Sequence, residues 1–112
     1  MDEGRLPTSL HVDAILKHCE IDFIPYYILQ KGEQVSGVIL AKLNRLDGHV
    51  SLRIQQRDFD TGKLGWVDAL GEAVLEEAKA DEYINRSKAR DPDLWVIEFE
   101  ARDLQNPFEK DL

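Results

Sequence analysis

Apolar residues recur at helical spacing near the start of the chain. Between residues 9 and 21 they fall at positions i, i+3, i+4 and i+7, which are Val12, Ile15, Leu16 and Cys19. This spacing places them on one face of an amphipathic helix, so the pattern predicts a helix over about residues 9–21. Thr8 or Ser9 is expected to cap its first turn, because a short hydroxyl side chain can accept an otherwise unpaired backbone N–H.

The following part of the chain has the pattern of short strands separated by polar turns. The segments predicted to be strands are residues 23–30, 38–44, 50–55 and 64–69. Pro25 has no backbone N–H, which favours a strand start or a sheet edge for the first segment. Asp47-Gly48 indicates a hairpin turn between the second and third segments. In the third segment Val50, Leu52 and Ile54 alternate with polar residues, so we expect one buried face and one solvated face.

A charged segment with good helix formers comes next, over residues 72–90. The residues expected to form its thin buried stripe are Ala73, Ala80, Tyr83, Ile84 and Ser87. Pro92 disfavours helical geometry at the residue before it and should end this helix. A fifth strand is expected directly afterwards, with core residues Trp95, Ile97 and Phe99. Residues 102–112 are mostly polar and are expected to trail along the surface, anchored by Phe108.

The predicted order is therefore α-β-β-β-β-α-β in a chain of 112 residues, a usual size for one domain. We predict a single globular domain over residues 1–112, of the α+β class. Because the clearest strand has one apolar face, both helices are expected on one face of a mostly antiparallel sheet of about five strands. Such an arrangement is a two-layer sandwich.

The net charge of −8 lies almost entirely in the second half of the chain. Residues 1–56 hold 6 Lys/Arg and 7 Asp/Glu, whereas residues 57–112 hold 8 and 15. Nucleic-acid binding depends on cations that neutralise phosphates, and the candidate cations Arg53, Arg57 and Lys63 share their region with Asp58 and Asp60. We therefore expect no nucleic-acid partner. The negative charge favours solubility, or an acidic face that binds a basic partner.

The compartment is expected to be the cytoplasm. Cys19 is the single cysteine, so no disulfide can form within the chain, which fits a reducing environment. The first residues are acidic and lack the apolar run of a signal peptide. No stretch of 18 apolar residues occurs, so no transmembrane helix and no membrane partner are expected.

Several His, Cys, Asp and Glu residues have side chains of the types that bind metals or catalyse reactions. His11, His18 and Asp22 share one helical stripe, but the two histidines lie about 10 Å apart along the axis, too far for one metal ion. Cys19 is expected to be a buried, inert thiol. Glu98 and Glu100 share one strand face, a pairing that suits hydrolysis but is more common as solvated surface. We expect no metal site and no cofactor.

Two known nucleotide-related patterns are also incomplete. Gly62-Lys63 lacks the rest of a phosphate-binding loop. The element order is similar to that of restriction-endonuclease-like nucleases, but their metal motif is missing, and fold alone does not give function. The hypothesis that the protein is a nuclease is therefore disfavoured.

The strongest candidate for interaction is the corner after the second helix. Asp91 and Asp93 bracket Pro92, beside Arg86 and Trp95. Asp side chains accept backbone N–H bonds in tight turns, which is the structural interpretation. The functional interpretation is a polar recognition corner, and the spacing does not separate the two.

Three segments resemble an uncharacterised bacterial family, the domain of unknown function 1491. They are Arg5-Leu6-Pro7-Thr8-Ser9-Leu10 with Val12-Asp13-Ala14, Gly37-Val38-Ile39-Leu40 with Lys42-Leu43-Asn44-Arg45-Leu46-Asp47-Gly48, and Ala80-Asp81-Glu82-Tyr83-Ile84-Asn85-Arg86 running into Arg90-Asp91-Pro92-Asp93-Leu94-Trp95-Val96-Ile97-Glu98. The resemblance implies a small single-domain bacterial protein with no established activity. Position 11 departs from the family pattern, since His11 stands where an aromatic residue is usual.

The functional hypothesis is a non-enzymatic module that binds another protein or a second copy of itself. The alternative is an enzyme or small-molecule binder with its site near the second helix and last strand. A concave pocket that gathers Arg86, Asp91, Asp93 and Trp95 would favour the alternative. A flat apolar patch would favour the module.

Overall fold

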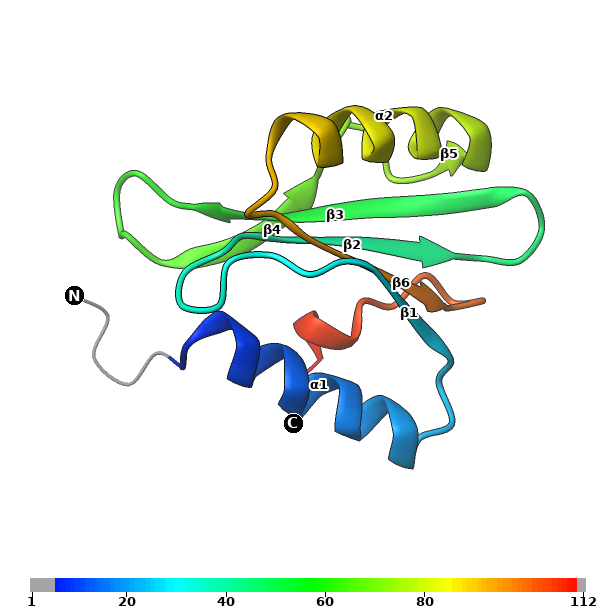
Figure 1. Cartoon of the computed structure of the whole chain (residues 1–112). Helices are drawn as coiled ribbons and strands as arrows, with labels where there is room; N and C mark the ends of the chain where they lie inside the picture. The colour runs from blue at the N-terminus through cyan, green and yellow to red at the C-terminus, as the bar shows by residue number, and fades with distance from the viewer. Residues whose placement is uncertain (1–5, 111–112) are drawn as a thin grey trace.

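A mixed six-stranded sheet forms the middle of the molecule, with one helix on each of its faces (Figure 1). The computed structural model describes residues 6–110. In chain order the elements are α1 (Thr8–Ile21), β1 (Tyr26–Gln30), β2 (Ile39–Asn44), β3 (His49–Arg57), β4 (Leu64–Asp68), β5 (Leu75–Glu76), α2 (Glu77–Arg90), β6 (Trp95–Glu100) and a 3-10 turn, η1 (Pro107–Glu109).

The sheet order is β1-β6-β2-β3-β4, and β5 pairs with β3 beside this path. The last strand in the sequence, β6, therefore lies between β1 and β2. It runs parallel to β2 and antiparallel to β1, and the remaining pairs are antiparallel. The α+β class, the mostly antiparallel character and the edge position of β1 are confirmed.

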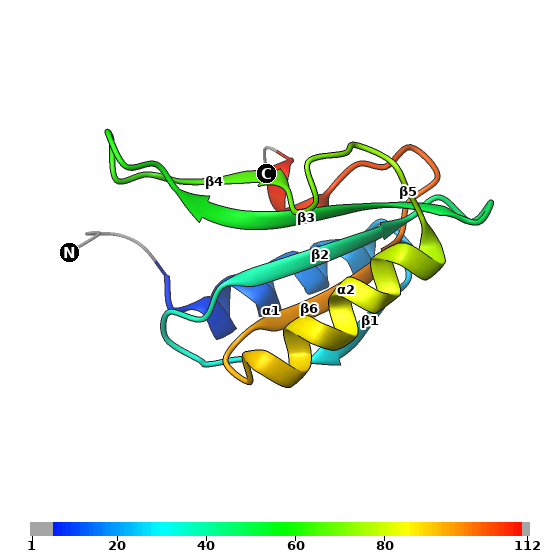
Figure 2. The ribbon, with the colours of Figure 1, turned by 90° about the horizontal axis from the view of Figure 1, so that it is seen from above.

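The prediction that both helices cover one face is wrong. Ile39, Ala41 and Leu43 pack in a cluster with α1, whereas Leu40 packs in a second cluster with α2. Figures 1 and 2 show the two helices on opposite sides of the sheet, so the molecule has three layers. The reason is that β2 and β6 are apolar on both faces, and a strand of that kind must be covered twice. The alternation of apolar and polar residues over positions 50–55 indicates one buried face for that strand only, and the central strands β2 and β6 do not share it.

The first turn of α1 is capped by a loop. Pro7 is the N-cap residue and no side chain caps the helix, so the prediction of Thr8 or Ser9 is wrong. The N–H groups of Thr8 and Ser9 donate to the carbonyls of Val35 and Gln34, at 3.0 and 2.9 Å. The loop between β1 and β2 therefore replaces the side-chain cap and fixes where α1 begins. The predicted apolar stripe of this helix is buried.

The second helix begins five residues later than predicted, at Glu77. The preceding residues Leu75 and Glu76 form β5 against β3, and the Glu77 N–H donates to the Gly48 carbonyl at 3.0 Å. Ala73 consequently lies in an exposed loop and not in the buried stripe. Ala80, Ile84 and Ser87 are buried as predicted, and the helix ends at Arg90 with Asp91 as its C-cap, directly before Pro92.

The segment after β6 lies partly on the surface and partly in the core. Asn106, Pro107 and Phe108 are buried, and the Asn106 Oδ1 accepts the Phe108 N–H at 3.1 Å. Phe108 joins the cluster beneath α1, as its role as an anchor predicted. Arg53 on β3 holds Glu109 through Nη2 at 2.7 Å and Nε at 3.0 Å, so η1 covers part of the face expected to be solvated.

Candidate binding groove

The structure does not gather the four residues of the predicted interaction corner into one site. Trp95 is buried on the α1 face, where its Nε1 donates to the Glu33 carbonyl at 2.8 Å. Arg86 lies on the exposed side of α2, which covers the opposite face of the sheet. Asp91 Oδ1 accepts the Asp93 N–H at 3.0 Å, the bond of a tight turn. The position of Asp91 and Asp93 fits the structural interpretation.

The other candidate residues have local structural roles. Cys19 is buried, and burial raises the pKa of its thiol. Tyr27 donates its hydroxyl to Glu100 at 2.8 Å, and Asn44 donates its amide to Glu98 at 2.9 Å. Within residues 6–110 no group of three or more His, Cys, Asp or Glu side chains could hold a metal ion. Over the same residues no helix is long and apolar enough to cross a membrane.

A buried lysine on the α2 face was not singled out in the sequence. Lys42 lies on β2 with its Nζ 2.7 Å from Glu77 and 2.8 Å from Asp81, both on α2, and 3.7 Å from Glu98 on β6. Burial alone would lower the pKa of Lys42, but the hydrogen bonds to these carboxylates raise it above its usual value. The ion pairs of Lys42 with Glu77 and Asp81 therefore attach α2 to the middle of the sheet.

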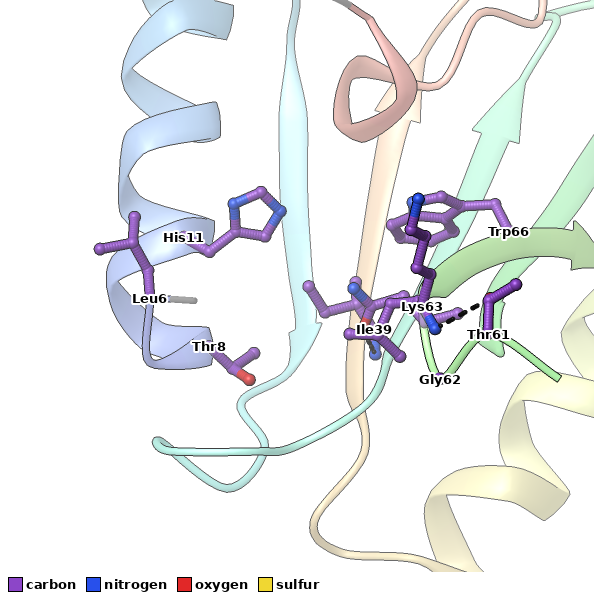
Figure 3. Close-up of a pocket in the computed structure, with 10 residues that line it drawn as sticks. Leu6, Thr8, His11, Ile39, Thr61, Gly62, Lys63 and Trp66 are labelled. Atoms are coloured by element: carbon purple, nitrogen blue, oxygen red, sulfur yellow. Dashed lines mark hydrogen bonds between the residues drawn. The ribbon is translucent and has the colours of Figure 1, made fainter. Parts of the chain in front are cut away.

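A hollow lies on the other face, between the start of α1 and the β3–β4 hairpin (Figure 3). Its volume is about 650 Å³. We call this hollow the groove. It is lined by Leu6, Thr8, His11, Ile39, Gln55, Thr61, Gly62, Lys63, Leu64 and Trp66. Figure 3 shows Leu6, Thr8 and His11 on one side, with Thr61, Lys63 and Trp66 on the other. The groove thus joins segments that are far apart in the sequence.

Aromatic packing holds the wall of the groove in place. The rings of Trp66 and Phe108 stack with centroids 5.4 Å apart at 26°. His11 contacts the same Phe108 ring from α1, also at 5.4 Å. Gln55 Oε1 accepts the Ile39 N–H at 3.0 Å, which fixes the amide at the floor. Since these side chains are anchored by η1 and by the backbone, the groove is largely preformed.

The charge of the groove differs from that of the whole chain. The chain carries 22 Asp and Glu, yet none of them is among the residues that line the groove. Its ionisable side chains are His11 and Lys63. Lys63 forms no ion pair with any residue of the described range 6–110. The groove therefore combines apolar side chains and the Gln55 amide with a cation.

One border of the groove is an open sheet edge. In the β3–β4 ladder the Asp58 N–H donates to the Lys63 carbonyl and the Ala69 N–H to the Leu52 carbonyl. Hydrogen-bonded and non-bonded pairs alternate along an antiparallel ladder. Leu64, Trp66 and Asp68 occupy the non-bonded positions, so their backbone groups point away from β3. No other strand of the described residues lies beyond β4. Two of the edge carbonyls have partners: Trp66 accepts from Arg53 Nη2 at 3.3 Å, and Asp68 accepts the Gly71 N–H at 3.1 Å.

In the sequence, Gly62-Lys63 matches only a fragment of a phosphate-binding loop, and Trp66 is recognisable only as a strand residue. A lysine directly before a strand with an exposed edge was the available signal. It was weak, because nothing local shows that α1 lies opposite.

This architecture defines a small α+β domain with a central parallel pair of strands, one open sheet edge and a groove beside it. The chain belongs to the family described as protein of unknown function (DUF1491), which matches residues 6–109. The resemblance seen in the sequence is thereby confirmed. No curated protein matches the chain.

Solved structures share the fold. The crystal structure of a DUF1491 family protein from Caulobacter crescentus CB15 is 28% identical, with a TM-score of 0.79 over 96% of this chain and 97% of that chain. The NMR structure of a DUF1491 family protein from Caulobacter crescentus CB15 is 27% identical, with a TM-score of 0.77 over 94% of each. A protein from A. tumefaciens is 22% identical, with a TM-score of 0.65 over 87% of this chain and 86% of that chain, and shows the fold alone.

Proposed function

We propose that this protein is a non-enzymatic interaction module that binds an extended segment of a partner protein. The segment adds to the sheet as a strand along β4 and places one apolar side chain in the groove. One observation carries the proposal: Leu64 and Trp66 line the groove with their side chains and also present backbone N–H groups at the edge that make no bond to β3. Strand addition uses these two features together, since main-chain bonds give affinity and pockets for alternate side chains give specificity.

The chemistry of the groove supports binding in preference to catalysis. Among its lining residues there is no carboxylate and no thiol, and the hydroxyl of Thr8 donates to the Gly37 carbonyl at 3.0 Å. The apolar residues Ile39, Leu64 and Trp66 offer surface to an aliphatic or aromatic side chain. Removing such surface from water favours formation of a complex.

Hydrogen exchange at the edge tests the proposal directly. Random heptapeptides displayed on phage are selected on the native protein, and the enriched peptides are added to labelled protein for NMR. Binding should slow exchange of the Leu64, Trp66 and Asp68 amides, because these N–H groups gain partners. The Gly65 and Val67 amides, already bonded to β3, are the internal control and should change little.

A proline variant provides a second control. Leu64 is the first residue of β4, where proline is tolerated, and its N–H makes no bond to β3. Leu64→Pro should fold and weaken peptide binding. The proposal is overturned by three results: no enriched peptide, peptides that leave all three edge amides unchanged, or edge protection that rises with protein concentration alone. The last result would mean that a second copy occupies the edge.

A small-molecule binder is the second candidate, and the groove volume favours it. About 650 Å³ falls within the range of pockets for small organic ligands. A compound library screened by NMR would support this candidate if hits shift the Trp66 indole resonance while the edge amides keep exchanging at their original rates.

A further inference from the structure

We infer that the segment bound in the groove is acidic: it carries a carboxylate next to its apolar anchor, and this carboxylate pairs with Lys63. The inference rests on the proposed function and adds to it the chemistry of the partner. It begins with the contrast between an acidic chain and a groove whose lining holds Lys63 and His11 but no carboxylate.

The turn that carries Lys63 is held in one conformation before any ligand binds. Asp58 Oδ1 accepts the N–H groups of Asp60 at 2.7 Å and Thr61 at 2.9 Å. Gly62 has a φ of +74°, which glycine adopts without strain, and its N–H donates to the Asp58 carbonyl at 2.8 Å. Thr61 Oγ1 then accepts the Lys63 N–H at 3.2 Å. The backbone of Lys63 is therefore fixed beside the groove.

The carboxylates nearest to Lys63 in the sequence do not neutralise it. Asp58 uses its charge inside the turn, where the N–H groups of Thr61 and Asp60 hold the pKa of its carboxyl below the usual value. Asp60 is exposed and lies outside the groove lining. Neither forms an ion pair with Lys63. Within residues 6–110, an incoming carboxylate therefore meets a cation that has no ion-pair partner to give up.

The surrounding charge makes this lysine selective. A basic segment would be attracted to the acidic molecule as a whole, but in the groove it would meet Lys63 without a compensating carboxylate. An acidic segment gains its ion pair only in the groove and is repelled elsewhere. Like charges placed together discriminate against the wrong partner as effectively as opposite charges favour the right one.

Selection of the same random heptapeptides on two charge variants tests the inference. On the native protein, enriched peptides should carry Asp or Glu at a fixed distance from an apolar anchor. On Lys63→Glu the apolar anchor should persist, and the acidic position should become neutral or basic. Lys88→Glu on α2 changes the net charge by the same amount on the opposite face and should keep the acidic preference.

Affinity measurements then quantify the pair. Replacing the carboxylate of an enriched peptide by its amide should weaken binding to the native protein up to about fivefold, the range for an exposed ion pair. The same replacement should have no effect on Lys63→Met. Enriched peptides that are apolar but neutral or basic would overturn the inference and leave strand addition standing. The absence of any enriched peptide would instead overturn strand addition.

Discussion

Phe23 is the residue whose backbone and side chain agree least with its surroundings. It directly follows the α1 C-cap with a φ of +57° and a side chain that is 91% exposed. Its N–H donates to the Glu20 carbonyl, and the Ile24 N–H donates to the Cys19 carbonyl. These two bonds form the Schellman motif, which usually holds glycine at this position.

Phe23→Gly should therefore increase the free energy of unfolding by about 0.5–1 kcal/mol. The strain of a bulky residue in the left-handed conformation is larger than the extra conformational entropy that glycine loses on folding. Urea denaturation measures the change. Leu104→Gly is the matched control, since Leu104 has the same φ of 57° but packs on the core, and it should destabilise. A destabilised Phe23→Gly protein would show that the ring makes a contact that outweighs the strain.

Ile97 tests the assignment of the core at a single side chain. It is fully buried on β6, in the cluster beneath α1. Ile97→Ala should lower the free energy of unfolding by roughly 2–5 kcal/mol through lost burial and the cavity left behind. Val74→Ala, at a side chain that is 37% exposed, should change it by less than about 0.5 kcal/mol. Equal effects of the two substitutions would contradict the packing described.

At the scale of elements, the attachment of η1 depends on one ion pair. Arg53 and Asn106 hydrogen bond to the Glu109 carboxylate and hold its pKa below the usual value. Phe108 in the same turn stacks on Trp66, so this pair also supports the wall of the groove.

Acidification should therefore release η1. A lowered folded-state pKa means that the stabilisation is fully present above the ordinary pKa of glutamate, near 4.5, and is lost as the pH falls through the lower folded value. The Trp66 indole N–H resonance should shift in that window below pH 4.5. In Glu109→Gln this transition should be absent. If it persists in the variant, the ion pair of Glu109 with Arg53 does not control the contact.

The elements that the sequence predicted well are those with a strong local signal. The stripe of α1 and the alternation after Pro92 fixed α1 and β6 to within a residue or two. The start of α2 was misplaced because β5 forms only through its pairing with β3. The groove could not be predicted, since Thr8, Gln55 and Trp66 meet only when α1 and the β3–β4 hairpin pack on the same face.

At the scale of the whole molecule, the distribution of charge bears on nucleic-acid binding. Arg53, one of the three candidate cations, is paired with Asp68 at 3.1 Å and Glu109 at 2.7 Å. A phosphate would have to displace these carboxylates. Gel-shift titrations at low salt should therefore show no retardation of DNA at micromolar protein. A complex that dissociates with added salt would contradict this prediction and revive the nuclease-like reading.

The position of β6 has a consequence for how the chain is made. A ribosome releases α1, β1 and β2 first, and β6 begins 56 residues after β2, counted from Ile39 to Trp95. Until it emerges, β1 and β2 have no common neighbour, and the apolar face of α1 lacks Trp95, Ile97 and Phe99 of its cluster. The apolar surface of α1 and β2 therefore stays exposed in the nascent chain until β6 is synthesised, as is common when pairing strands are far apart in the sequence. A chain truncated before Trp95 would lack β6. Strand β1 would then have no hydrogen-bonded neighbour, and β2, β3 and β4 would remain as a separate part of the sheet.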